Sequence, residues 1–294
     1  MQKSWRAALA LLVSALFIST SVLAAALPGL PSQDERLTYA IMVGGIHLGD
    51  ALIVLNQSPT GYTTEMKVTA RGVAKMVKNF SSEMRGEGRF TDGIKPQPAV
   101  YSRQWSTDEV AAEMTMTYDA SGAAKSDERY YNPATAAPIP FDQLPWNDRG
   151  EKPRDVPQDM RSNAFDPMAA FIAARGQIRA QGVTAGPKNF RVPIFDGRRR
   201  YDIVGKADAA RDVTINGTTH TVIPVVAKLE PVFGFGRKSE ERMKDSEGKL
   251  LFTNDARFIP VQVTISNEML SGVMNLTADC SQNAAACDTF GKAE

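Results

Sequence analysis

Apolar and polar side chains alternate with a period of two along most of this chain. In the clearest run, 80–90, charged residues fill one side of the predicted strand, and the other side carries Phe80, Ser82, Met84, Gly86, Gly88 and Phe90. Other runs of this kind cover 62–70, 112–119 and 261–266. Such alternation is typical of a β-strand that has one buried face and one solvated face.

Short turn sequences separate these runs. They include Ser58-Pro59-Thr60-Gly61 and Asn216-Gly217, and the second pair suits a type I′ hairpin because both residues accept a positive φ. Strands that are joined by short hairpins run antiparallel. The pattern therefore predicts a mainly β protein with a single curved antiparallel sheet, either a half-open barrel or a β-spiral.

One segment has the period of a helix instead. Asp166 is a favourable N-cap, Pro167 suits the first helical position, and Gly182 ends the pattern. An apolar stripe follows the start of this segment and consists of Met168, Phe171, Ile172 and Ile178. We expect one main α-helix, at about 167–180, that packs across the sheet.

A proline-rich stretch, 132–162, breaks the strand pattern. Its six prolines disfavour regular structure, and they are Pro133, Pro138, Pro140, Pro145, Pro153 and Pro157. The stretch is either a linker between two halves or a long loop that wraps the domain. Phe141, Leu144 and Trp146 favour a loop that docks, because a solvated linker seldom carries such residues.

The first two dozen residues predict export. Lys3 and Arg6 precede an apolar run that ends at Leu23, and the small or branched residues at 22–24 suit signal peptidase. We expect a signal peptide at 1–24, an N-terminal linker at 25–36, a β-domain at 37–279 and a C-terminal tail at 280–294. An uncleaved anchor is the alternative, although the run is short for the ~20 apolar residues that span a bilayer.

Charge and cysteine usage narrow the function classes. Removal of Lys3 and Arg6 leaves 32 of the 34 basic residues against 33 acidic residues, a formal net charge of −1. This balance gives no reason to expect a nucleic-acid partner. The two cysteines, Cys280 and Cys287, are close in sequence, which in an exported protein favours a disulfide that pins the tail.

The search for catalytic chemistry is mostly negative. The two histidines, His47 and His220, each stand alone in a strand-like run. A nucleophile elbow, a phosphate-binding loop and a dinucleotide fingerprint are absent from the sequence. We expect neither an enzyme nor a cofactor nor a metal site. An unrecognised enzyme would place its site at Asp196 and Arg198-Arg199, near Tyr201.

The many methionine side chains on the predicted inward faces suggest a binding role. Methionine adapts its shape to irregular apolar ligands, and Gly86 and Gly88 leave volume or allow the sheet to bend. We therefore expect a hydrophobic cleft whose candidate ligand-binding residues are Met66, Met76, Phe80, Met84, Phe90, Met114, Met116 and Phe171. An ordinary filled core with a glycine bend explains the same residues and stays open as the alternative.

Several stretches together resemble the DUF3108 family. They are Tyr39, Gly44-Gly45-Ile46, the helix start at 165–170 and the FDGRRRYD run at 195–202, within a resemblance that covers about 37–275. The resemblance implies an exported protein of a Gram-negative bacterium, hence the periplasm, with no catalytic residues to assign. The expected fold is loosely similar to LolA/LolB-type lipoprotein carriers, which is an analogy of fold alone.

Three functional hypotheses follow. The first is a periplasmic, non-catalytic protein that binds a hydrophobic ligand such as a lipid or acyl chain and supports cell-envelope integrity. The second is a structural or interaction protein of the envelope with a filled core and a protein partner. The third, with the poorest support, is an unrecognised enzyme. We expect no stable membrane span after signal cleavage.

Overall fold

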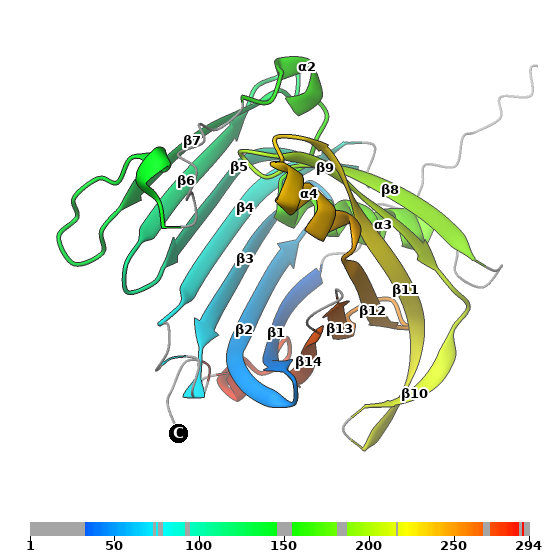
Figure 1. Ribbon diagram of the computed structural model, residues 1–294. Helices are drawn as coiled ribbons and strands as arrows, with labels where there is room; N and C mark the ends of the chain where they lie inside the picture. The colour runs from blue at the N-terminus through cyan, green and yellow to red at the C-terminus, as the bar shows by residue number, and fades with distance from the viewer. Residues whose placement is uncertain are drawn as a thin grey trace, which may run out of the picture.

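The computed structural model describes residues 33–72, 75, 79–91, 95–145, 155–180, 187–215, 217–266, 271–287 and 290. These residues form one 14-stranded sheet that curls into a nearly closed barrel (Figure 1). All neighbouring strands pair antiparallel. This architecture confirms the predicted fold class.

The strands are long, and most of them follow one another as hairpins. In chain order they are β1 (Gln33–Val43), β2 (Ile46–Gln57), β3 (Gly61–Ala70), β4 (Ser81–Thr91), β5 (Lys95–Ser106), β6 (Ala111–Tyr118), β7 (Ala124–Tyr131), β8 (Lys188–Phe195), β9 (Arg200–Ala207), β10 (Arg211–Ile215), β11 (Thr218–Phe233), β12 (Glu247–Thr253), β13 (Pro260–Ser266) and β14 (Ser271–Asp279). The sheet order is β7-β6-β5-β4-β3-β2-β1-β14-β13-β12-β11-β9-β8, and β10 pairs with β11. Pairing of β1 with β14 joins the two ends of the chain in the middle of the sheet.

The hairpin turn at 216–217 illustrates how local sequence sets the register. Ile215 pairs with Thr218, so two residues connect β10 to β11. Gly217 has a φ of 81°, which glycine adopts without steric cost. Asn216, which we expected to share this turn, lies outside the described residues.

The main helix, α3 (Pro167–Ala180), lies inside the curl of the sheet and packs against β8, β5 and β4 (Figure 1). Oδ1 of Asp166 accepts hydrogen bonds from the backbone N–H groups of Met168 and Ala169, both at 2.9 Å. Asp166 is therefore the N-cap of α3, as the sequence predicts. The observed helix matches the expected range, 167–180.

The expected linker, 25–36, is wrong at its C-terminal end. β1 begins at Gln33, and Glu35 is buried. The reason is an ion pair with the helix, because Arg175 of α3 donates two hydrogen bonds to the Glu35 carboxylate, at 3.0 and 2.7 Å. The strand can include this charged residue because its charge is neutralised inside the barrel.

The seam between β7 and β8 is closed by loops and side chains. Phe165 forms an isolated parallel bridge with Ile194 of β8. At the β8–β9 turn, the carbonyl oxygen of Gly197 accepts a hydrogen bond from Ser126 Oγ of β7, at 2.7 Å. The described residues of the proline-rich loop, 132–145 and 155–162, include two short helices, η1 (Phe141–Gln143) and α2 (Gln158–Arg161), so this part of the loop is less irregular than we expected.

Two further helices lie in the described part of the chain. α4 (Arg237–Lys244) connects β11 to β12, and η3 (Ala284–Cys287) lies in the C-terminal tail. Cys280 and Cys287 form a disulfide, with their Cα atoms 5.8 Å apart. Both cysteines are buried against Leu52 of β2, so the disulfide fixes the tail onto the barrel.

Candidate functional site

The inner face of the barrel is the first candidate for a binding site, and α3 covers only part of it. Core side chains of α3 pack with those of β8, β9 and β11 in one large buried cluster. A second cluster, around the start of α3, includes residues of β5, β6 and β7. In Figure 1 α3 lies in the upper part of the barrel, away from the lower ends of β1 and β14.

Apolar side chains continue along the inner face toward those lower ends. In one row across neighbouring strands, Ile41 is paired with Met274, Met274 with Val263, and Val263 with Leu250. In the next row Val43 and Ile265 flank Gly272. We define the inner apolar surface as Ile41, Val43, Leu250, Val263, Ile265 and Met274.

The inner apolar surface is not closed off from solvent. Ile265 is 61% exposed, and the other five side chains are half-buried. Ile41 and Met274 nevertheless pack against the buried Tyr39 and Ile259, which places the row on the same side as the core. A contiguous apolar surface that stays accessible on a concave sheet has the character of a binding site for a hydrophobic molecule.

Sequence reasoning did not select these six residues. The alternation at 261–266 predicted the strand and its apolar face. The pattern cannot reveal how far along the face a covering helix reaches. Exposure of Ile265 follows from the position of α3, which contacts β8, β5 and β4.

Four of the predicted methionines do come together on the inner face. Met66 is paired with Met84, and Arg103 separates Met84 from Met114 in the same row. Met114 and Met116 are buried beside Met168 of α3, whereas Met66 and Met84 are half-buried. Met114 and Met116 are thus core residues in this structure. Only Met66 and Met84 border the accessible part of the inner face.

The predicted aromatic residues have separate positions. Phe90 contacts Tyr62, with ring centroids 5.4 Å apart, and Phe171 of α3 lies 6.5 Å from Phe252. Both are partly buried against the largest core cluster. Phe80 is 38% exposed, just before β4. Met76 lies outside the described residues.

The two glycines of β4 allow close packing instead of leaving space. A Cβ atom on Gly88 would lie 2.6 Å from the Tyr62 hydroxyl oxygen. A Cβ atom on Gly86 would lie 2.8 Å from Thr64 Oγ1 and 3.3 Å from Met168 Cβ. The volume that these glycines leave is therefore filled by Tyr62 and by the start of α3.

A buried polar cluster surrounds the start of α3. Oδ2 of Asp166 and the hydroxyl groups of Tyr62 and Tyr118 are buried without a hydrogen-bond partner. Burial raises the pKa of Asp166 to about 6. Burial, together with the nearby Asp166 charge, also raises the pKa of both tyrosines far above the ordinary value. The tyrosines are therefore neutral hydroxyl groups at physiological pH.

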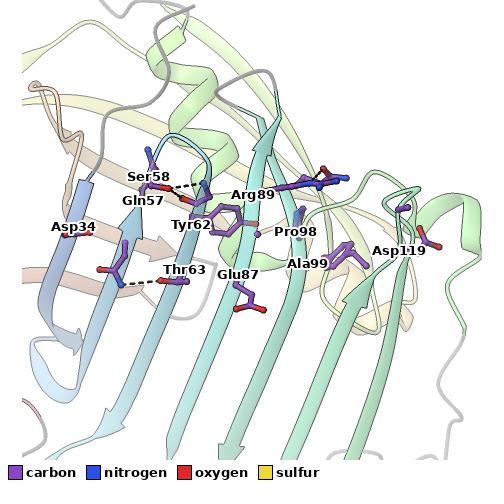
Figure 2. A pocket seen from close by; sticks show the side chains of 16 residues that line it. Asp34, Gln57, Ser58, Tyr62, Thr63, Glu87, Arg89, Pro98, Ala99 and Asp119 are labelled. Carbon is purple, nitrogen blue, oxygen red and sulfur yellow. Dashed lines mark hydrogen bonds between the residues drawn. The ribbon is translucent and has the colours of Figure 1, made fainter.

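A groove of about 700 Å³ lies at one rim of the barrel, around the 57–61 turn (Figure 2). Its lining combines apolar surface with three carboxylates and the guanidinium of Arg89, which donates a 2.8 Å hydrogen bond to Gln97. The carboxylates belong to Asp34, Glu87 and Asp119. Such a lining does not suit a hydrocarbon chain, which has no groups to replace the solvation of these charges.

The family model described as "Protein of unknown function (DUF3108)" matches residues 37–277. The chain belongs to the DUF3108 family. No protein with a curated description matches it. Among solved structures, it is similar to a beta-barrel-like protein of domain of unknown function DUF1849 from Brucella abortus, with 12% identity and a TM-score of 0.48 over 83% of this chain and 95% of that chain.

The FDGRRRYD run of this DUF3108 protein forms the β8–β9 turn. Oδ1 of Asp196 accepts hydrogen bonds from the backbone N–H groups of Arg198 and Arg199, at 3.0 and 2.7 Å, which stabilises the turn. Arg200 donates a hydrogen bond to Asp202, at 2.5 Å. These contacts give the run a structural role at the barrel seam.

The remaining polar features are dispersed. His47 lies on β2, where its Nε2 atom is 2.9 Å from Oδ1 of Asp50, and His220 lies on β11. Within the described ranges, His, Cys, Asp and Glu residues form no group of three or more that suits a metal ion. Over the same part of the chain, no helix is long and apolar enough to cross a bilayer.

Proposed function

We propose that this DUF3108 protein is a periplasmic, non-catalytic binding protein whose inner apolar surface takes a lipid or an acyl chain, and that it supports cell-envelope integrity in this way. The observation that carries the proposal is the 61% exposure of Ile265 in a row of apolar side chains on the concave side of the sheet. Coverage of such side chains by hydrocarbon is favourable, at roughly 25 cal/mol per Å² of apolar surface.

The chemistry of the surface supports an apolar ligand. Val43, Ile265 and Met274 bring branched and flexible side chains into adjacent positions, and Gly272 between them adds no bulk. Met66 and Met84 extend the surface toward β4, because Met66 packs in the same cluster as Ile41 and Met274. Methionine side chains adapt to ligands of variable shape, which suits acyl chains of different length.

The compartment and the absence of catalysis are parts of the proposal. The basic residues and apolar run at 1–24 support export to the periplasm, where a water-exposed acyl chain needs a carrier. Within the FDGRRRYD run, the Asp196 carboxylate stabilises the turn and Arg200 is paired with Asp202 on β9. Their engagement favours a structural role over a catalytic one.

A pair of matched variants tests the proposal. Ile265→Asn places an amide on the inner apolar surface, whereas Val232→Asn makes a comparable change at a 47% exposed position of β11 that alternates with the inward Phe233. We expect the mature protein to bind a fluorescent fatty acid, Ile265→Asn to weaken binding several-fold, and Val232→Asn to have no effect. Equal binding by all three proteins would contradict the assignment of the surface.

The alternative is a structural or interaction protein with a filled core. The complete burial of Met114 and Met116 around α3 favours it for the upper half of the barrel. This alternative predicts no binding of the fluorescent fatty acid. It predicts instead that cross-linking in cells captures a specific envelope protein and that the Ile265→Asn variant complements a deletion strain fully.

A further inference from the structure

A second cavity, of about 450 Å³, lies at the seam of the barrel, beside β7. Three segments that are distant in sequence build it: the edge strand β7, the proline-rich loop and the β8–β9 turn. The loop is held to β7 by a 2.9 Å hydrogen bond from the backbone N–H of Ile139 to the carbonyl oxygen of Tyr130. The walls of the cavity are thus fixed by backbone contacts.

Most of the wall is apolar or aromatic. Ile139, Phe141 and the two flanking prolines come from the loop, and Tyr130 comes from β7. The rings of Tyr130 and Phe141 are 5.9 Å apart, and Trp105 lies behind Tyr130 at 6.4 Å. These residues offer a rigid surface for the apolar part of a ligand.

One guanidinium faces this surface. Arg198 lies over the Phe141 ring, with its Cζ atom 4.3 Å from the ring centroid, and its Nη1 atom donates a 2.9 Å hydrogen bond to the Tyr130 hydroxyl. Its Nε atom is buried and lies 3.6 Å from a carboxylate oxygen of Glu128, while the side chain as a whole lines the cavity and is 26% exposed. A ligand therefore meets the terminal N–H groups of a guanidinium that is held on an aromatic ring, and such groups bind anionic oxygens well.

The neighbouring charged residues favour an anion that carries a single negative charge. Glu128 accepts a 2.9 Å hydrogen bond from Arg103 and lies 3.6 Å from the Nε atom of Arg198. Arg129, the other arginine in the lining, donates a 3.0 Å hydrogen bond to Glu113. With Glu128 so close, a doubly charged phosphate would be repelled, whereas a single carboxylate can bind the terminal N–H groups of Arg198.

We propose that the seam cavity is a binding site for a monocarboxylate with an apolar body, whose carboxylate binds Arg198 and whose hydrocarbon part lies against Ile139 and Phe141. The site is separate from the inner apolar surface, so it can be confirmed or refuted independently of the function proposed above. It also gives the proline-rich loop and the Arg198 side chain a role beyond closure of the barrel.

Methyl NMR of the mature protein, with labelled isoleucine, tests the site with octanoate and octanol as probes. We expect the Ile139 methyl signal to shift saturably with octanoate, and octanol to bind on the order of tenfold more weakly, since it lacks the charge-assisted hydrogen bonds. The Ile265 signal reports on the inner apolar surface in the same titration, so failure at one site is distinguished from failure at the other.

Two variants separate the charge from the apolar wall. Arg198→Gln is expected to reduce octanoate binding to the level of octanol, whereas Arg85→Gln, on the outer side of β4, leaves it unchanged. Ile139→Asn is expected to weaken the binding of octanoate and of octanol by the same factor. This variant keeps the test decisive should Arg198→Gln fail to fold. Equal affinity for octanoate and octanol, an unmoved Ile139 signal, or full octanoate affinity in Arg198→Gln would overturn the proposal.

Discussion

Arg175 of α3 and Glu35 of β1 form a two-pronged ion pair inside the barrel, with N–O distances of 3.0 and 2.7 Å, across 140 residues of sequence. Arg175 also donates a hydrogen bond to the carbonyl oxygen of Arg257, and its guanidinium lies 5.3 Å from the Phe171 ring centroid. The pair therefore fixes α3 to the first strand and to the loop before β13. The position of α3 in turn decides which part of the inner face stays accessible.

The first prediction concerns this pair. Glu35→Gln is expected to lower the free energy of unfolding by about 3–5 kcal/mol, because it leaves the Arg175 charge buried without its partner. Glu35→Leu combined with Arg175→Met is expected to recover most of the loss, since no unpaired charge remains. Urea denaturation measures both, and a single variant as stable as the wild type would show that the pair does not hold the helix.

The second prediction concerns pH and Asp166. Burial raises the pKa of Asp166 to about 6, from an ordinary value of 3.8, so the folded state binds a proton more readily than the unfolded state. Its contribution to stability is greatest below pH 4 and is lost as the pH rises through 6. Asp166→Asn keeps a capping side chain but has no such titration.

The comparison between Asp166→Asn and the wild type isolates this effect. The advantage of the variant in free energy of unfolding is expected to shrink by about 3 kcal/mol between pH 7 and pH 3, the linkage value for a shift of this size. Urea denaturation over this range provides the measurement. A constant difference between the two proteins would mean that Asp166 titrates normally.

The third prediction concerns the glycines of the sheet. Gly88→Ala is expected to destabilise the protein by about 1–3 kcal/mol, because the new methyl group meets the Tyr62 hydroxyl and the carbonyl oxygen of Gln97. Gly248→Ala is the matched control, since the nearest atom to its Cβ would be 3.6 Å away. Thermal unfolding should separate the two variants, and equal melting temperatures would refute the packing argument.

The fourth prediction concerns the tail. Replacement of Cys280 and Cys287 by alanine is expected to cost about 2 kcal/mol, at the low end for disulfides, because the closed loop is short. Since the bond lies outside the strand pairing, the far-ultraviolet circular dichroism of the barrel should be unchanged. Loss of the β-sheet signal in the double variant would show that the disulfide holds the fold itself.

Local patterns were sufficient to predict most of the architecture. Alternation at 80–90 corresponds to β4, and the Asp166-Pro167 pair places the start of α3 correctly. These features depend on neighbours in sequence, which fix the strand face and the helix cap. The antiparallel pairing of consecutive strands follows equally from short hairpins, whereas the pairing of β1 with β14 does not.

The position of the site required long-range contacts. Burial of Met114 depends on the start of α3, and exposure of Ile265 depends on the position of this helix, which packs against β8, β5 and β4. The role of Gly88 depends on Tyr62 from the neighbouring strand. The seam cavity joins Ile139 to Arg198, which no periodic pattern connects.

Bound lipid is the most direct test of the proposed function. The mature protein and its Ile265→Asn variant, purified from the periplasm without detergent, can be compared by native mass spectrometry followed by lipid extraction. We predict that the wild-type protein carries a mass that extracts as an acyl lipid and that the variant carries distinctly less. A wild-type protein that is free of lipid, and that also fails to take up a fluorescent fatty acid, would contradict the account.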